Sequence, residues 1–239
     1  MEKTELLLVI VKTVCGLAYG LAAGWSAVWV YNHLPLTWFL DEGEELDPDP
    51  ERAAAGRKTL RVWPWRYVFA MFFTAVGIWL IVHDPLTAAA ELTALWLLVI
   101  LSVSDLKYRI LPDGLVILVL ATAIGSVHYH GLRDILLGLL AGFGVMAACA
   151  LLGKALHKKM AVGGGDIKLM AALGALTGLA GILAIFVLST MAAAFFYAFQ
   201  LGRKRMKPAD ALPMAPFITG ATAVYMVFLF DRMGVWLSL

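Results

Sequence analysis

Long apolar stretches, separated by short polar connections, make up most of this chain. A helix needs about 20 mainly apolar residues to cross the hydrocarbon core of a bilayer. The sequence offers about eight stretches that reach or approach this length, and the boundary between the sixth and seventh falls at Gly178–Gly181. They lie at residues 6–32, 67–83, 86–104, 114–129, 132–153, 167–180, 182–201 and 212–230. The pattern predicts an all-α, polytopic membrane bundle with about eight transmembrane helices.

The composition supports this class of protein. Of the 239 residues, 62% are hydrophobic and only 15% are charged, so too few polar side chains remain to cover a soluble core. The first stretch is too long for the core of a signal peptide and is predicted to be a retained helix. Cys15 and Cys149 lie inside apolar stretches and offer neither a disulfide framework nor a metal knuckle. We expect one membrane domain that covers residues 1–239.

Basic residues predict the orientation of the bundle. Most Lys and Arg residues, 15 of 19, fall in four connections, and such connections face the cytoplasm in membrane proteins. These connections are 33–66, 105–113, 154–168 and 202–210. We therefore expect a protein of the cytoplasmic (inner) membrane with both termini outside and with lipid as a partner. The net charge of +2 gives no indication of a nucleic-acid partner.

The connection 33–66 is the one long polar segment. It holds seven acidic residues between Asp41 and Glu51, followed by basic residues. The run is predicted to be a solvated loop with little regular structure. An alternative is that its charge attracts a basic peptide and raises the local concentration of that substrate.

Two acidic residues at the ends of apolar stretches are the candidate catalytic groups. Asp105 ends the third stretch, and Asp166 follows Gly163, Gly164 and Gly165 at the start of the sixth. Carboxylates beside hydrocarbon are costly and mark functional sites by default. Two neighbouring carboxyls cannot both ionise easily, so one acts as a base toward water while the other acts as an acid. The glycines allow positive φ and close approach of an extended substrate.

Each aspartate also has a purely structural interpretation. Asp166 could cap its own helix, and Asp105 could pair with the basic residues two or four positions later. As a catalytic pair, Asp166 is the expected base because the positive end of a helix dipole favours its charge, which leaves Asp105 as the acid. Strong coupling between the two carboxyls would blur this division.

Three further residues are predicted to play supporting parts. Asp113 follows a proline and is predicted to be the N-cap of the helix that begins at Gly114. Lys168 lies two residues after Asp166, where it could tune the charge of that carboxyl, although we expect it to reach toward the membrane interface. Pro213 lies in the opening turn of the last predicted helix.

Three segments carry a resemblance to a known family. The sequence DLKYRILPD, from Asp105 to Asp113, resembles the first aspartate motif of the type IV prepilin peptidases. The sequence GGGDIKLMAALG, from Gly163 to Gly174, is similar to their GxGD motif and the helix that follows. The sequence LPMAPF, from Leu212 to Phe217, is similar to the segment that opens their last helix. The resemblance covers about residues 95–225.

The resemblance implies an aspartyl membrane peptidase. Family members remove the basic leader from prepilins and pseudopilins on the cytoplasmic side, cutting after a glycine, in type IV pilus and protein secretion systems. Asp105 and Asp166 match the catalytic pair, which works through water without a metal or cofactor. Many bacterial members also methylate the new N-terminus with S-adenosylmethionine. Those members usually carry a four-cysteine zinc site in the first cytoplasmic loop. That site is absent here, which counts against methylation without deciding it, so S-adenosylmethionine stays open as a cosubstrate while no zinc site is evident.

Two alternatives remain from the sequence. One is another GxGD intramembrane protease of the presenilin or signal-peptide-peptidase kind, but Ser104 stands where those proteins have a tyrosine. The other is a small transporter with a proton-relay acid pair, which would place its acids near the middle of the membrane. The sequence indicates neither the particular pilin nor the oligomeric state.

Overall fold

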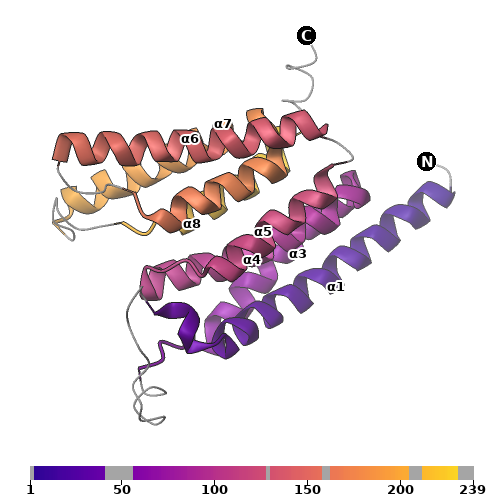
Figure 1. Cartoon of the computed structure of the whole chain (residues 1–239). Helices are drawn as coiled ribbons and strands as arrows, with labels where there is room; N and C mark the ends of the chain where they lie inside the picture. Colours follow the sequence, from indigo (N-terminus) through magenta and orange to yellow (C-terminus); the bar gives the residue numbers. More distant parts are fainter. Residues whose placement is uncertain (1–2, 41–55, 128–129, 158–161, 205–211, 231–239) are drawn as a thin grey trace. The chain divides into compact units, whose positions relative to one another are not determined.

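The computed structural model describes all residues except 1–2, 41–55, 128–129, 158–161, 205–211 and 231–239 (Figure 1). Most described residues are helical and none belongs to a strand, which confirms the predicted all-α fold. The helical segments are α1 (Lys3–His33), η1 (Leu36–Phe39), α3 (Val62–His83), α4 (Pro85–Tyr108), α5 (Asp113–Thr122), η2 (Ala123–Ser126), α6 (Leu132–His157), α7 (Gly164–Gly202), α8 (Ala215–Val224) and the π-helical η3 (Tyr225–Leu229). They form two compact units, Met1–Pro112 and Asp113–Leu239.

The eight predicted stretches correspond to five long helices and two shorter ones. In the described part of the chain, α1, α3, α4, α6 and α7 are long and apolar enough to cross a membrane. The stretch predicted at 114–129 is shorter, because α5 passes into a 3₁₀ turn and the helix ends at Ser126. The stretch predicted at 212–230 begins later, at Ala215, and ends in η3. Hydropathy locates apolar residues, but it does not register such changes of helix type.

In the first unit, α1 packs closely against α3 through three glycines. A Cβ placed on Gly20 would lie 2.4 Å from the Cα of Thr74, and Gly16 and Gly24 meet α3 backbone almost as closely. Small residues at four-residue spacing allow two membrane helices to approach in this way. The glycine face of the first helix is therefore a helix contact, as its spacing predicts.

Helix α4 is the most buried long helix of the first unit. Leu95, Leu98 and Leu101 are fully buried along it. It is also tied to α1 by hydrogen bonds, because the hydroxyl of Tyr19 donates to the Leu92 carbonyl at 2.8 Å and the indole N–H of Trp96 donates to the Ala23 carbonyl at 3.2 Å. These contacts hold the helix that carries Asp105.

In the second unit, α7 is broken at Gly178. The backbone there has φ +70° and ψ −178°, a conformation that is accessible essentially only to glycine. The break divides α7 into residues 164–177 and 179–202, and it confirms that the boundary predicted at Gly178–Gly181 interrupts the helix. Tyr225 packs against Gly181 just after the break.

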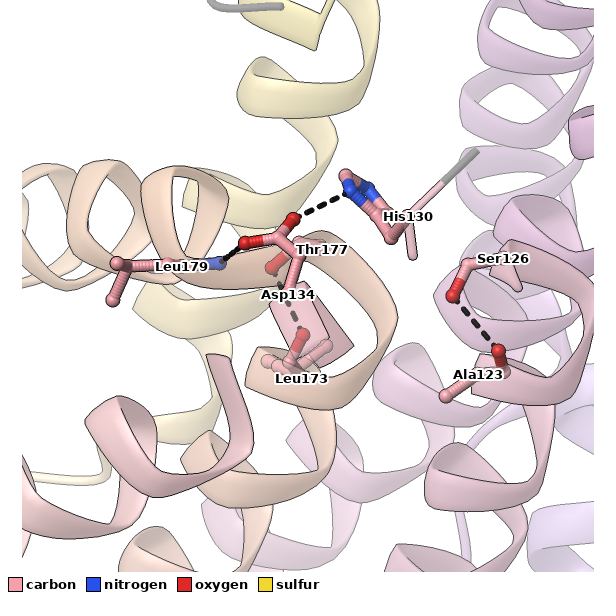
Figure 2. Close-up of polar contacts among 7 residues, drawn as sticks. All are labelled: Ala123, Ser126, His130, Asp134, Leu173, Thr177 and Leu179. Atoms are coloured by element: carbon pink, nitrogen blue, oxygen red, sulfur yellow. Dashed lines mark hydrogen bonds and ion pairs between the residues drawn. The ribbon is translucent and has the colours of Figure 1, made fainter. Parts of the chain in front are cut away.

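The broken helix is capped by a side chain from α6 (Figure 2). The Leu179 N–H, freed by the break, donates to Oδ1 of Asp134 at 3.1 Å. The other oxygen of Asp134 lies 2.8 Å from Nδ1 of His130. On the other side of the break, the Thr177 hydroxyl donates to the Leu173 carbonyl at 2.9 Å. Asp134 thus serves as an N-cap supplied by a neighbouring helix.

We expect Asp134→Ala to destabilise the second unit by about 1 kcal/mol or more, because it removes a cap from a helix start. Asp134→Asn should retain most of the stability, since an amide oxygen accepts the same hydrogen bond. Thermal unfolding in detergent measures both variants. Arg133→Ala changes the exposed neighbour and is the matched control. An Asp134→Ala protein as stable as this control would contradict the capping role.

The first half of α7 also packs on α6 at backbone distance. A Cβ on Gly174 would lie 2.0 Å from the Gly138 carbonyl oxygen, and a Cβ on Gly142 would lie 2.2 Å from the Met170 carbonyl oxygen. Only glycine at these positions allows the two helices to lie so close. This contact fixes the helix that carries Asp166 in its first turn.

Candidate active site

Asp105 lies in the last turn of α4 and is 7% exposed. The helix ends at Tyr108 and its C-cap is Arg109, which adopts the left-handed conformation with φ 59° and donates its N–H to the Asp105 carbonyl at 2.9 Å. The buried Ser104 hydroxyl donates to the Ile110 carbonyl at 2.6 Å and braces the same turn. The carboxyl is therefore carried by a firmly closed helix end.

Asp166 lies in the first turn of α7, as the third residue of the helix. The N-cap is Gly163, so the alternative in which Asp166 caps its own helix is wrong. The Asp166 side chain turns back toward this cap, because a Cβ on Gly163 would lie 3.3 Å from Oδ2 of Asp166. The residue is half-buried, and its Oδ1 atom is buried. Its carboxylate is close to the positive end of the α7 dipole.

The glycines before Asp166 do not adopt the expected positive φ. Gly163 has φ −70° and ψ 146°, and Gly164 and Gly165 already belong to the helix. Among the glycines in the described residues, only Gly178 has positive φ. The helix begins earlier than predicted, so these glycines form its cap and first turn. An added Cβ on Gly164 would meet no atom within 4 Å, which leaves the backbone beside Asp166 open.

Asp113 and Lys168 form an ion pair in the second unit. The Lys168 ammonium donates to both oxygens of the Asp113 carboxylate, at 2.9 and 2.8 Å. Asp113 is the first residue of α5, and its side chain turns toward this lysine rather than serving as the predicted N-cap. The Lys168 ammonium therefore has a carboxylate partner from α5. More than half of each side chain is exposed, so the pair connects the two motifs but adds little stability.

The remaining candidates are Pro213 and the acidic run. Pro213 is half-buried and precedes α8, whose first turn contains Pro216 instead. The run Asp41–Glu51 lies outside the described residues, so its predicted solvated loop stays a prediction. No three His, Cys, Asp or Glu side chains in the described ranges are grouped so that they could hold a metal ion.

Sequence reasoning missed the residues that brace the end of α4. Tyr108 stacks on Phe39 and accepts a hydrogen bond from the backbone of Lys58. Ser104 was noted only as a departure from another protease family, yet its hydroxyl closes the turn after Asp105. The sequence shows Tyr108 between basic residues, but no local pattern indicates that its partner Lys58 lies 50 positions earlier.

Fold and candidate site together define an all-α, multi-pass membrane protein with an acidic side chain near the end of each of two helices. Residues 92–198 match the model of the type IV leader peptidase family, and this range includes both Asp105 and Asp166. The match confirms the resemblance to the type IV prepilin peptidases that the motifs indicate.

Curated relatives show the same similarity. The chain is 36% identical over 134 residues to a prepilin leader peptidase/N-methyltransferase of Xanthomonas campestris pv. campestris, which covers 55% of this chain and 46% of the relative. Proteins of the same name match at 30% identity over 62% of the chain and 51% of the relative in Dichelobacter nodosus, and at 31% over 65% and 61% in Bacillus subtilis. The matched part thus spans about half the length of the first two relatives. No solved structure matches.

Proposed function

We propose that the chain is a membrane aspartyl endopeptidase that removes the leader peptide from type IV prepilins or pseudopilins. One observation carries the proposal: the region that matches the leader peptidase family contains Asp105 and Asp166, the aspartates of the two motifs, and each lies in a terminal turn of a membrane-length helix. The relatives' names supply the substrate class.

In the proposed reaction, Asp105 and Asp166 act on the same scissile peptide, one as a carboxylate and the other as a neutral carboxyl. The ionised carboxylate removes a proton from water, and the water oxygen bonds to the peptide carbonyl carbon while the neutral carboxyl protonates the carbonyl oxygen. When this tetrahedral intermediate collapses, the C–N bond breaks and the leaving amine takes a proton from the first carboxyl. No covalent bond to the enzyme forms.

The helix ends favour one division of these roles. Asp166 lies at the positive end of α7, which favours the carboxylate, whereas Asp105 lies in the buried last turn of α4, at the negative end of that helix. We therefore assign Asp166 as the base and Asp105 as the acid in the resting enzyme. Gly163–Gly165 are assigned to substrate binding, because the backbone at Gly164 is open to an extended peptide. The Asp113–Lys168 pair and Pro213 are assigned supporting roles.

The proposed orientation in the membrane rests on the positions of the Lys and Arg residues. The active site faces the cytoplasm of the inner membrane, and both chain termini lie outside. A proton-relay transporter is disfavoured, because Asp105 and Asp166 lie at helix ends rather than midway along a span. The relatives' names include N-methyltransferase, so the comparisons leave S-adenosylmethionine open as a cosubstrate. We assign no residue to it.

Cleavage of a purified prepilin by the full chain in detergent tests the function. We expect two products, a leader that ends in glycine and a mature protein that begins with the next residue, as identified by mass spectrometry. Cleavage at scattered positions, or intact prepilin after incubation with folded protein, would contradict the proposal.

A further inference from the structure

The end of α4 that carries Asp105 is clamped to the connection between α1 and α3. Tyr108, the last residue of α4, stacks on Phe39 with ring centroids 4.5 Å apart and an interplanar angle of 14°. Phe39 is buried and also contacts Tyr31 of α1, with centroids 6.0 Å apart. One face of the Tyr108 ring is thus tied to the segment that leaves α1.

The segment that returns toward α3 holds the same tyrosine. The Lys58 backbone N–H donates to the Tyr108 hydroxyl at 2.6 Å, and the Lys58 ammonium donates to the Lys107 carbonyl at 2.9 Å. That ammonium also lies 5.1 Å from the centre of the Tyr108 ring. Lys58 is fixed in turn by Tyr31, whose hydroxyl donates to the Lys58 carbonyl at 3.2 Å.

A second anchor keeps the returning segment in register. The Asn32 side chain exchanges two hydrogen bonds with the backbone of Leu60, at 3.0 and 2.8 Å. Arg57, which immediately precedes Lys58, donates a side-chain hydrogen bond to the Leu34 carbonyl. The lysine that holds Tyr108 is therefore fixed by contacts on either side of it in sequence.

These contacts have a consequence for Asp105, which precedes Tyr108 by one helical turn. Helix ends fray because their last carbonyls lack partners within the helix. Here the last turn is closed by Arg109 in a conformation that is unfavourable for a residue with a side chain. The contacts of Tyr108 hold this turn together and keep the carboxyl of Asp105 in place.

An ordinary interfacial tyrosine would look different. Tyr67, near the start of α3, is 56% exposed, as expected of a belt residue whose ring lies among lipid head groups. Tyr108 is half-buried, its ring is stacked, and its hydroxyl accepts from a backbone N–H. We propose that Tyr108 is a positioning residue for Asp105, which couples the connection between α1 and α3 to the carboxyl. Its catalytic consequence rests on the proposed function.

Chemical labelling at position 105 tests the clamp without requiring peptidase activity. In a background with Cys15 and Cys149 replaced by alanine, Asp105→Cys provides one thiol for a maleimide. We expect Tyr108→Ala to raise the labelling rate about fivefold or more, as loss of about 1 kcal/mol of local closure would do. Tyr108→Phe retains the stacking and should give a smaller increase, and Tyr67→Ala should give none. Equal rates for Tyr108→Ala and Tyr67→Ala overturn the proposal, whatever the peptidase assay shows.

The catalytic readout uses the chain with Asp105 intact. We expect Tyr108→Ala to lower kcat for prepilin about tenfold with KM within twofold, because substrate contacts remain while the acid is displaced. The separation between the two apparent pKa values of the kcat profile should also differ from that of the wild type, because the coupling between the carboxyls changes. Faster labelling with unchanged kcat and pH profile overturns the positioning role. If Asp105→Asn itself remained active, the proposed function would fail while the labelling result would still decide the clamp.

Discussion

Asp105→Asn and Asp166→Asn each lower kcat for prepilin cleavage by about a hundredfold or more, because an amide neither removes a proton from water nor protonates a leaving amine. The change is nearly isosteric, so KM and thermal stability should change far less than kcat. Steady-state cleavage by full-length variants in detergent measures both constants, and thermal unfolding checks that each variant is folded.

Asp84→Asn is the matched control for these variants. Asp84 lies at the opposite end of α4, where its side chain accepts a hydrogen bond from the Leu86 N–H at 3.1 Å. Asparagine caps a helix about as well as aspartate does, so this variant should keep wild-type kcat. A loss in the control as large as the loss in Asp105→Asn would show that the assay responds to any removal of negative charge from α4.

Gly138→Ala has the largest expected effect on stability. Its new Cβ would lie 2.1 Å from the Gly174 carbonyl oxygen, which is backbone and cannot rotate away. The helices α6 and α7 must therefore separate, at a cost of about 1–3 kcal/mol or more. We expect a clearly lower unfolding temperature, together with reduced kcat because α7 carries Asp166.

Gly144→Ala, on the same helix, separates the packing effect from any general effect of substitution. A Cβ at this position would meet no atom within 4 Å. Alanine is favoured over glycine inside a helix by up to about 1 kcal/mol, so this variant should be as stable as the wild type or more stable. If Gly138→Ala unfolded at the same temperature as Gly144→Ala, the close approach of α6 to α7 would be contradicted.

Most of the fold could be predicted because hydrophobic runs report directly on membrane-length helices. The contact of Gly16, Gly20 and Gly24 with α3 also matches their four-residue spacing, which is a packing signal in membrane helices. The break in α7 was visible as glycines at 178 and 181, but its location depends on backbone angles. Its cap could not be predicted, because Asp134 is 45 positions away from Leu179.

The candidate site divides in the same way. Sequence placed Asp105 and Asp166 at helix ends, because a charged residue rarely continues an apolar helix without cost. It predicted an N-cap role for Asp113, which is wrong, because that carboxylate pairs with Lys168 across 55 positions. Local rules cannot supply so distant a partner. Tyr108 was missed for the same reason, since its contacts come from the α1–α3 connection.

The pH dependence of kcat tests the central claim most directly, namely that Asp105 and Asp166 act as one coupled acid–base pair. Single-turnover cleavage of a prepilin by the wild type should give a bell-shaped profile, because one carboxyl must be ionised and the other protonated. In Asp105→Asn and Asp166→Asn, the residual activity should lose this bell. A profile that keeps its shape after removal of either carboxyl would contradict the account.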